Sequence, residues 1–280
     1  MTDFSDTAKS PALQAKFPER AALWKRISKF ACRTQKQRLT AERFYHLPEP
    51  FVFSEPDLRI AFISDLHYTG SAKCKAILNE IINSLCNNPC KLLLLGGDIC
   101  SDGSKLHLLH EVLDKLSHCA EKCIAIPGNW ERGKCWLSEN YWRDLYNAHG
   151  IEYLLNQTIN IGNITITGVD DTAQGCPEIP CKFSQDCCNI LLAHRPDTVI
   201  YLDKEQALDN CHLILCGHTH AGQIRIVRGL LPASKYGCRF DYGFFRKSTG
   251  SLMYVSSGTG ELSFPWRFNA PREIVFFQKD

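Results

Sequence analysis

The sequence RIAFISDLH, at residues 59–67, indicates how this chain of 280 residues is built. Residues 59–63 form an apolar run with the length of a buried β-strand, and Asp65 and His67 follow it directly. The same order, an apolar run and then polar residues, recurs at residues 91–98 and 123–129, with helical patterns in between. Alternation of strands and helices is typical of α/β layers.

The expected strands fall into two groups along the chain. The first three runs are separated by patterns of helical spacing, such as Ile77, Ile81 and Leu85. The later runs are closer together and are joined by turns, which predicts a second sheet with antiparallel pairing. These later runs are residues 164–167, 189–193, 213–216, 223–227, 252–255 and 273–277.

Side chains that can bind a metal ion follow five of these runs. Carboxylate oxygens and imidazole nitrogens are ligands for divalent ions such as Mn, Fe and Zn. In open α/β sheets, ligands collect at the carboxyl ends of the strands. We therefore expect one rim of the fold to carry a metal site. Its expected ligands are Asp65, His67, Asp98, Asn129, His194, His218 and His220.

The spacing of these residues suits two ions. Asp65 and His67 can reach one ion from a strand end that turns into a loop, and the two oxygens of Asp98 can bridge two ions. Two ions about 3.5–4 Å apart can clamp phosphoryl oxygens during in-line attack, so the set predicts a hydrolase of phosphate esters or anhydrides. Asp-x-His and Gly-Asp are weak signals alone, and a lone His194 would more often be a core histidine. Gly-His-Thr-His at residues 217–220, after four apolar residues, is a moderately strong signal. All five motifs in this order, each at a strand end, are a strong signal.

Composition limits the class of protein. The net charge of +2 gives no overall signature of nucleic-acid binding. We expect no transmembrane helix, because no sufficiently long apolar run occurs, and no signal peptide, because the first residues lack a basic and an apolar region. The fifteen cysteines fit a disulfide framework or reduced thiols that pack as small hydrophobes. The absence of a CxxC pair and the apolar neighbours of Cys100, Cys123 and Cys216 favour reduced thiols and a cytoplasmic location.

The N-terminal segment is basic. Residues 1–46 contain ten Lys and Arg against four Asp and Glu, a net charge of +6, which leaves −4 on the remaining chain. We expect residues 1–10 to be disordered and residues 11–46 to form an amphipathic helix with Phe17 and Trp24 on its apolar side. Such a helix can lie on an anionic membrane surface. Alternatively, it packs on its own domain and leaves a solvated charged face.

Residues 58–280 resemble the calcineurin-like metallophosphoesterase superfamily, in particular its membrane-associated bacterial branch. In that branch His-x-Pro-Asp precedes Gly-His-Thr-His-(Gly/Ala)-Gly-Gln, and here residues 194–197 are HRPD and residues 217–223 are GHTHAGQ. Residues 257–260 (SGTG) and 271–274 (PREI) are also similar. The resemblance implies an α/β fold over residues 58–280, an αββα sandwich of two mixed sheets flanked by helices. Residues 1–57 would then be a basic segment and linker.

The resemblance also implies how the ions are shared. Asp65, His67, Asp98 and His220 would hold one ion, and Asp98, Asn129, His194 and His218 the other. The family usually uses Mn, with Fe or Zn in some members, so we expect two divalent ions, Mn ahead of Fe, Zn or Mg. Asp98, Asn129 and His194 would be the catalytic residues.

One departure from the family bears on the substrate. The family pattern Gly-Asn-His-(Asp/Glu) reads Gly-Asn-Trp-Glu at residues 128–131, so Trp130 replaces a histidine that protonates the leaving group. An alkoxide benefits from such an acid, whereas a phosphate leaving group needs it far less. Trp130 therefore favours phosphoanhydrides or activated diesters over phosphomonoesters. We expect Trp130 and Arg195 to bind the substrate, with a surface position as the alternative for Arg195.

The narrowest interpretation joins this departure to the basic segment. Lipid A biosynthesis needs hydrolysis of UDP-2,3-diacylglucosamine to UMP and lipid X, and some metallophosphoesterases that do this replace the same histidine. A nucleotide-linked lipid substrate would place the protein peripherally on the inner face of the bacterial inner membrane. One alternative is a broad phosphodiesterase acting on nucleotide or phospholipid diesters. Another is a lipid-binding membrane adaptor without catalytic activity.

Three further features leave two interpretations each. Asp170 and Asp171 could orient a ligand histidine or lie in a plain turn. The aromatic residues at 240–245 and 264–268 could line an acyl or uracil site or pack in the core. His107 and His110 share a helix face, and without nearby acids to complete a metal site we expect them to be either solvated or structural.

Overall fold

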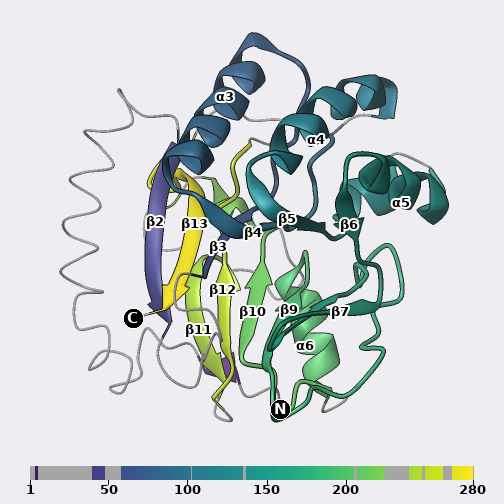
Figure 1. Cartoon of the computed structure of the whole chain (residues 1–280), viewed down its shortest axis with the longest axis vertical. Coiled ribbons are helices and arrows are strands. Elements are labelled where there is room, and N and C mark those ends of the chain that lie inside the picture. Colours follow the sequence, from purple (N-terminus) through teal and green to yellow (C-terminus); the bar gives the residue numbers. More distant parts are fainter. Residues whose placement is uncertain are drawn as a thin grey trace.

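The computed structural model describes residues 4–5, 40–47, 58–101, 103–134, 137–204, 207–223, 225, 240–247, 250–260 and 267–279. These residues form two stacked sheets with helices on the outer faces (Figure 1). Helices α3 (Ala72–Asn87), α4 (Leu109–Ser117) and α5 (Glu139–Ala148) cover one sheet, and α6 (Pro196–Lys204) packs on the other. The α/β sandwich predicted from the sequence is confirmed.

The first sheet has six strands in the order β2-β13-β3-β4-β5-β6. All neighbours run parallel except β3 and β13, which are antiparallel. In β3, Ile60 and Phe62 face the other sheet, whereas Ala61 and Ile63 face the helices, so both faces are buried and the strand is a continuous apolar run. The strands are β2 (Thr40–Leu47), β3 (Arg59–Ile63), β4 (Cys90–Leu95), β5 (Ala120–Ala125), β6 (Ile151–Tyr153) and β13 (Arg272–Lys279).

The second sheet has seven strands in the order β1-β11-β12-β10-β9-β8-β7. Its four central strands are parallel, and antiparallel pairs occur only towards the two edges. The expected antiparallel pairing is thus correct at the edges and wrong in the centre, where α6 returns the chain between β9 and β10 and keeps them parallel. The strands are β1 (Phe4–Ser5), β7 (Gln157–Ile161), β8 (Ile164–Gly168), β9 (Cys188–Leu192), β10 (Leu213–Cys216), β11 (Gly243–Lys247) and β12 (Leu252–Val255).

Residues 40–46 belong to strand β2, so the helix expected over residues 11–46 is wrong in this part. β2 pairs with β13 along its whole length, from Thr40 beside Arg272 to Leu47 beside Lys279. Its side chains alternate: the ring of Phe44 stacks on Phe276 with centroids 4.9 Å apart, and that of Tyr45 packs against Phe277 at 6.0 Å. The gain from this long-range pairing outweighs the local helical spacing.

For the rest of the N-terminal segment, few of the residues on which predictions were made are described by the structure. Phe4–Ser5 form the short strand β1 on β11, which corrects the expectation of disorder at these two residues. Residues 6–39, where most of the expected amphipathic helix falls, lie outside the described residues. The division of the chain at residue 58 stays a prediction, and β2 adds a segment from before that boundary to the sheet.

Two expectations from composition concern the membrane and the cysteines. Within the described part of the chain, no helix combines the length and the apolar character that crossing a bilayer demands. The twelve described cysteines are all free thiols, and six of them are buried, as expected for cysteines that pack as small hydrophobes. Burial raises the pKa of Cys123 and of Cys188 to about 12, which keeps both thiols neutral.

Candidate metal centre

The seven expected ligands meet where strands of both sheets end. β3, β4 and β5 of the first sheet lead into Asp65 and His67, Asp98, and Asn129. β9 and β10 of the second sheet lead into His194 and into His218 and His220. Backbone hydrogen bonds join adjacent loops, with His67 N donating to Asp98 O at 3.0 Å and Gly217 N to His194 O at 3.0 Å. The carboxyl ends of the parallel strands therefore form one site between the sheets.

A first cluster consists of Asp65, His67 and His220, whose ligand atoms all lie within 4.8 Å of one another. His67 Nε2 and His220 Nε2 are 3.0 Å apart, and His220 Nε2 lies 3.5 Å from Asp65 Oδ1. All three side chains are buried. Two imidazole nitrogens and a carboxylate oxygen thus converge on one point.

A second cluster consists of Asp98, His194 and His218, also within 4.8 Å of one another. His194 Nε2 lies 3.2 Å from Asp98 Oδ2, 3.2 Å from His218 Nδ1 and 3.2 Å from Asn129 Oδ1. Asp98 and His194 are buried, and Asn129 and His218 are partly exposed. Asn129 therefore joins this cluster, as expected.

Asp98 lies between the two clusters. Its Oδ2 atom is 3.2 Å from His194 Nε2 in the second cluster and 3.8 Å from His67 Nε2 in the first. Its Oδ1 atom accepts a hydrogen bond of 2.8 Å from the Trp130 backbone N–H. This position is the one that a bridging carboxylate needs.

The backbone at the site is strained. Five of the seven expected ligands have a positive φ, a left-handed conformation that side chains other than glycine rarely adopt: Asp65 (54°), His67 (47°), Asp98 (55°), His218 (69°) and His220 (49°). Each such residue costs about 1–3 kcal/mol unless its surroundings hold it, and such strain collects at functional sites. The loop hydrogen bonds that join the strand ends hold these residues in place.

Two glycines let the loops approach the carboxylates. A Cβ atom on Gly217 would lie 2.3 Å from Asp65 Oδ2, and one on Gly128 would lie 2.1 Å from Asp98 Oδ1. Both distances are far below van der Waals contact, so only glycine fits. Next to Gly217, the backbone N–H of His218 donates to Asp65 Oδ2 at 2.9 Å.

The ligands are oriented by buried partners. His194 Nδ1 lies 2.8 Å from Gly96 O, so Nδ1 donates its proton there and Nε2 is left to face the cluster. Ser64 Oγ donates to Asp65 Oδ2 at 2.6 Å. Arg267, which also donates to the backbone carbonyls of Ser257 and Ala270, places Nη2 2.9 Å from His220 Nδ1.

The pKa shifts of the histidines differ between the two clusters. Burial lowers the pKa of His67 and of His220, which keeps both imidazoles neutral, the form that binds a metal. Burial also disfavours charge on His194, but the neighbouring Asp98 raises the pKa of His194 to about 10. Despite its burial, Asp98 beside His194 has a pKa below the ordinary value. The second cluster therefore contains an ion pair, whose proton a bound metal ion would displace.

Trp130 and Arg195, the expected substrate-binding residues, lie beside the site. Trp130 is partly exposed, and its ring meets that of His67 edge to face at a centroid distance of 5.7 Å. Arg195 Nε donates to the buried carboxylate of Asp171 at 2.6 Å. Arg195 is therefore held by the fold rather than projecting freely, and its contact with a substrate stays a prediction.

Sequence reasoning missed two residues that support the site. Glu131 has no exposed surface, and its carboxylate accepts four backbone hydrogen bonds from the Asp98 and Asn129 loops. An acidic residue directly after the Gly-Asn motif was the available signal for it. Arg267 had no local signal, because its contact with His220 spans 47 residues.

The structure bears on two of the open interpretations. Asp170 and Asp171 form ion pairs with Arg132 and Arg195, and neither carboxylate is hydrogen-bonded directly to a ligand histidine. Phe240 and Phe245 are buried in the core under α6, which corrects the suggestion that they line an acyl or uracil site. Residues 264–266 lie outside the described residues.

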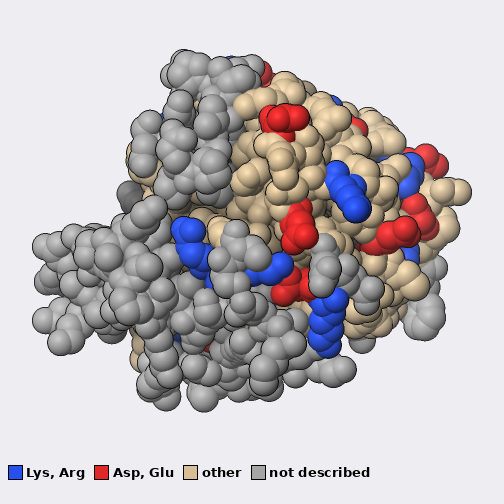
Figure 2. All heavy atoms as spheres, turned by 90° about the horizontal axis from the view of Figure 1, so that it is seen from below, with Lys and Arg blue, Asp and Glu red and all other residues tan. Residues whose placement is uncertain are grey.

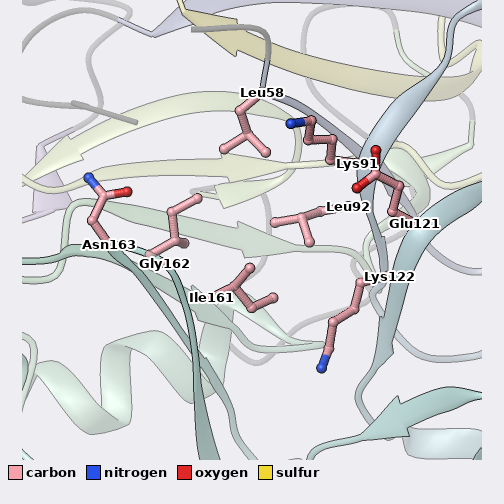
Figure 3. Close-up of a pocket in the computed structure, with 9 residues that line it drawn as sticks. Leu58, Lys91, Leu92, Glu121, Lys122, Ile161, Gly162 and Asn163 are labelled. Carbon is pink, nitrogen blue, oxygen red and sulfur yellow. The ribbon is translucent and has the colours of Figure 1, made fainter. Parts of the chain in front are cut away.

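A separate pocket between β4, β5 and the β7–β8 hairpin contains none of the expected site residues (Figure 3). Leu58, Leu92 and Ile164 give it an apolar floor, and Lys91 and Lys122 lie at its edge. On the described part of the face in Figure 2, Lys and Arg are interspersed with Asp and Glu, which agrees with the low net charge.

Comparison with known proteins agrees with this geometry. The family model for calcineurin-like phosphoesterases matches residues 58–222. An uncharacterized metallophosphoesterase of Helicobacter pylori is 28% identical over 245 residues, 80% of this chain and 60% of that protein. The phosphodiesterase YaeI of Escherichia coli is 30% identical over 175 residues, 60% of this chain and 62% of that protein.

Among solved structures, a dimetal phosphatase from Danio rerio is 11% identical with a TM-score of 0.46, covering 73% of this chain and 88% of that one. The chain spans about three fifths of the length of the Helicobacter and Escherichia relatives. The family match covers more than half of the chain and contains all seven expected ligands. The chain belongs to the calcineurin-like phosphoesterase family.

Proposed function

We propose that this chain is a two-metal hydrolase of phosphodiester or phosphoanhydride bonds. The observation that carries the proposal is the pair of donor clusters that meet at Asp98, with Trp130 rather than an acid beside them. A single metal site would need only one of the clusters.

The donor set fits two divalent ions. Asp65, His67, Asp98 and His220 would hold one, and Asp98, Asn129, His194 and His218 the other. Mixed carboxylate, amide and imidazole donors suit Mn, and also Fe or Zn, better than Mg, which prefers an all-oxygen shell. When bound, such ions lower the pKa of a coordinated water and draw negative charge from phosphoryl oxygens.

Trp130 argues for a leaving group that departs without a proton. The indole N–H is only a hydrogen-bond donor and does not act as an acid near neutral pH. The ring lies against His67, and Trp130 occupies the sequence position at which the family has its histidine. Diesters with a good leaving group and diphosphates therefore fit the site better than simple phosphomonoesters.

A finer proposal names a nucleotide-linked lipid, UDP-2,3-diacylglucosamine, cleaved to UMP and lipid X. Its support is the partly exposed indole of Trp130 next to the ligands, which offers a face on which a nucleobase can stack. The basic segment before β2, residues 11–39, would then bring the protein to an anionic membrane surface. In this proposal, Arg195 contributes its remaining guanidinium N–H groups to a substrate phosphate.

The test is a substrate panel assayed with and without Mn²⁺. We expect Mn-dependent release of UMP from the UDP-linked lipid and slower hydrolysis of bis(p-nitrophenyl) phosphate, with little hydrolysis of glycerol phosphate. Trp130→His should raise the rate with the monoester relative to wild type, by about 10²-fold for a restored general acid. Turnover of diesters without UMP release would favour the alternative of a broad phosphodiesterase. Metal binding without turnover of any substrate would favour the lipid-binding adaptor.

Membrane binding can be tested by a truncation guided by the structure. Removing residues 1–39 retains β2 and takes away the two-residue strand β1, whereas removing residues 1–46 would also delete most of β2. Nine Lys and Arg are lost with residues 1–39, so we expect binding to vesicles with 30 mol% phosphatidylglycerol to fall by at least about tenfold. Sedimentation with neutral phosphatidylcholine vesicles is the control. Equal binding before and after truncation would contradict the proposal.

A further inference from the structure

The acidic pair after β8 connects the two sheets at the metal centre. Asp170 accepts two hydrogen bonds from Arg132, from Nε to Oδ1 at 2.7 Å and from Nη2 to Oδ2 at 2.9 Å. Asp171 accepts one from Arg195 Nε at 2.6 Å. The carboxylates are 4% and 0% exposed, so both ion pairs are shielded from water and stronger than surface pairs. We call these four residues the brace.

The two arginines of the brace follow ligands of the second cluster in sequence. Arg132 comes three residues after Asn129, in the loop that leaves β5 of the first sheet. Arg195 comes directly after His194, where the chain leaves β9 of the second sheet. One short segment, residues 170–171, thus holds the loops that deliver Asn129 Oδ1 and His194 Nε2 to within 3.2 Å of each other.

The acidic residues are themselves fixed. Asp170 Oδ1 accepts the Asp171 backbone N–H at 2.8 Å, and Asp170 Oδ2 accepts that of Cys176 at 3.1 Å. Asp171 Oδ1 accepts the backbone N–H groups of Ala173 and Gln174, both at 3.0 Å. Neither carboxylate can follow its arginine without breaking a turn. The brace therefore fixes the positions of Arg132 and Arg195 in addition to neutralising their charge.

We infer that the brace sets the spacing of Asn129 and His194 and thereby the affinity of the second cluster for its ion. The inference rests on the proposed function in assigning these two side chains to an ion. Asp171 and Arg195 are positioning residues, because neither approaches the donor atoms of the cluster directly. Loss of a residue that orients a metal ligand typically weakens metal binding by about 10–100-fold. The first cluster, whose residues Asp65, His67 and His220 make no contact with the brace, should keep its ion.

Asp171→Asn is the sharpest variant. The amide oxygen can keep the turn bonds that Oδ1 accepts, while an NH₂ group replaces the oxygen that faces Arg195. With Mn²⁺ alone in equilibrium dialysis, we expect wild type to bind two ions and the variant to bind the second about 10–100-fold more weakly. Arg195→Gln should do the same, and Arg195→Lys should recover part of the affinity. Asp171→Asn with Arg195→Gln should be no worse than either change alone.

A matched control separates positioning from general stability. Asp203→Asn removes the buried ion pair with Lys247, whose side chains are 4% and 9% exposed, at the far end of α6. Thermal unfolding in EDTA should show comparable losses of stability for Asp203→Asn and Asp171→Asn, whereas only the latter loses the second ion. A variant that still binds both ions like wild type overturns the brace, as do additive losses in the double variant. Wild type that binds fewer than two ions overturns the proposed function instead, and the brace with it.

Discussion

Asp98→Asn is expected to lower kcat/KM with a phosphodiester by about 10³-fold or more, equivalent to ~4 kcal/mol of transition-state stabilisation. Asn keeps the shape of the side chain, and its oxygen can keep the bond from Trp130 N to Oδ1. The change replaces the Oδ2 atom, which lies between His194 and His67, by an NH₂ group without a lone pair for a metal. The two clusters then lose the atom that they share.

The experiment measures rates at saturating Mn²⁺ together with the metal content of the dialysed protein. We expect the variant to retain fewer than two ions while its far-UV circular dichroism stays that of wild type. Asp144→Asn, on the exposed side of α5, is the matched control and should change neither quantity. Activity of Asp98→Asn within tenfold of wild type would contradict the bridging position of Asp98.

Glu131→Ala is expected to destabilise the folded protein by at least about 3 kcal/mol. The Glu131 carboxylate accepts the N–H groups of Ile99 at 2.8 Å and Cys100 at 3.2 Å through Oε1. Through Oε2 it accepts those of Asp98 at 2.9 Å and Gly128 at 3.0 Å. Alanine leaves four N–H groups without this acceptor in a place that water does not reach, since Glu131 is fully buried.

Urea denaturation in EDTA measures this effect without a contribution from metal binding. The midpoint should fall while the slope m stays unchanged, because the change alters stability and not the surface exposed on unfolding. Glu178→Ala, at an exposed position, is the control and should stay within about 0.5 kcal/mol of wild type. A loss below about 1 kcal/mol for Glu131→Ala would show that the loops find other acceptors.

The strands that lead into the site could be predicted because their own residues, without any distant partner, indicate a buried strand. A strand buried on both faces must be apolar along its length, and β3, β4, β9 and β10 were recognised for that reason. The ligands were predictable because they follow these strands directly. β2 was not, because the bonds that make it a strand come from β13, and Thr40 pairs with Arg272 more than two hundred residues later.

The residues that hold the expected ligands in place also depend on partners that are distant in the sequence. Arg195 stood beside His194 in the sequence, but its partner Asp171 could not be inferred, since both a phosphate clamp and a surface position were consistent with the pattern. Arg267 and His220 meet only because the segment before β13 folds back onto β10. The first contact depends on the pairing of β8 with β9, and the second on how the two sheets stack, which no short stretch of sequence encodes.

The sequence by itself predicted the layered α/β class and the seven expected ligands, because each follows from a strand and the residues directly after it. The similarity to the family added that Trp130 stands where a histidine is usual. Only the tertiary structure decided that β2 completes the sheet and that the brace joins the loops of Asn129 and His194. The physical reason is distance along the chain. Periodicity reports which face of an element is buried, whereas hydrogen bonds and ion pairs between distant segments form only when packing brings both partners together.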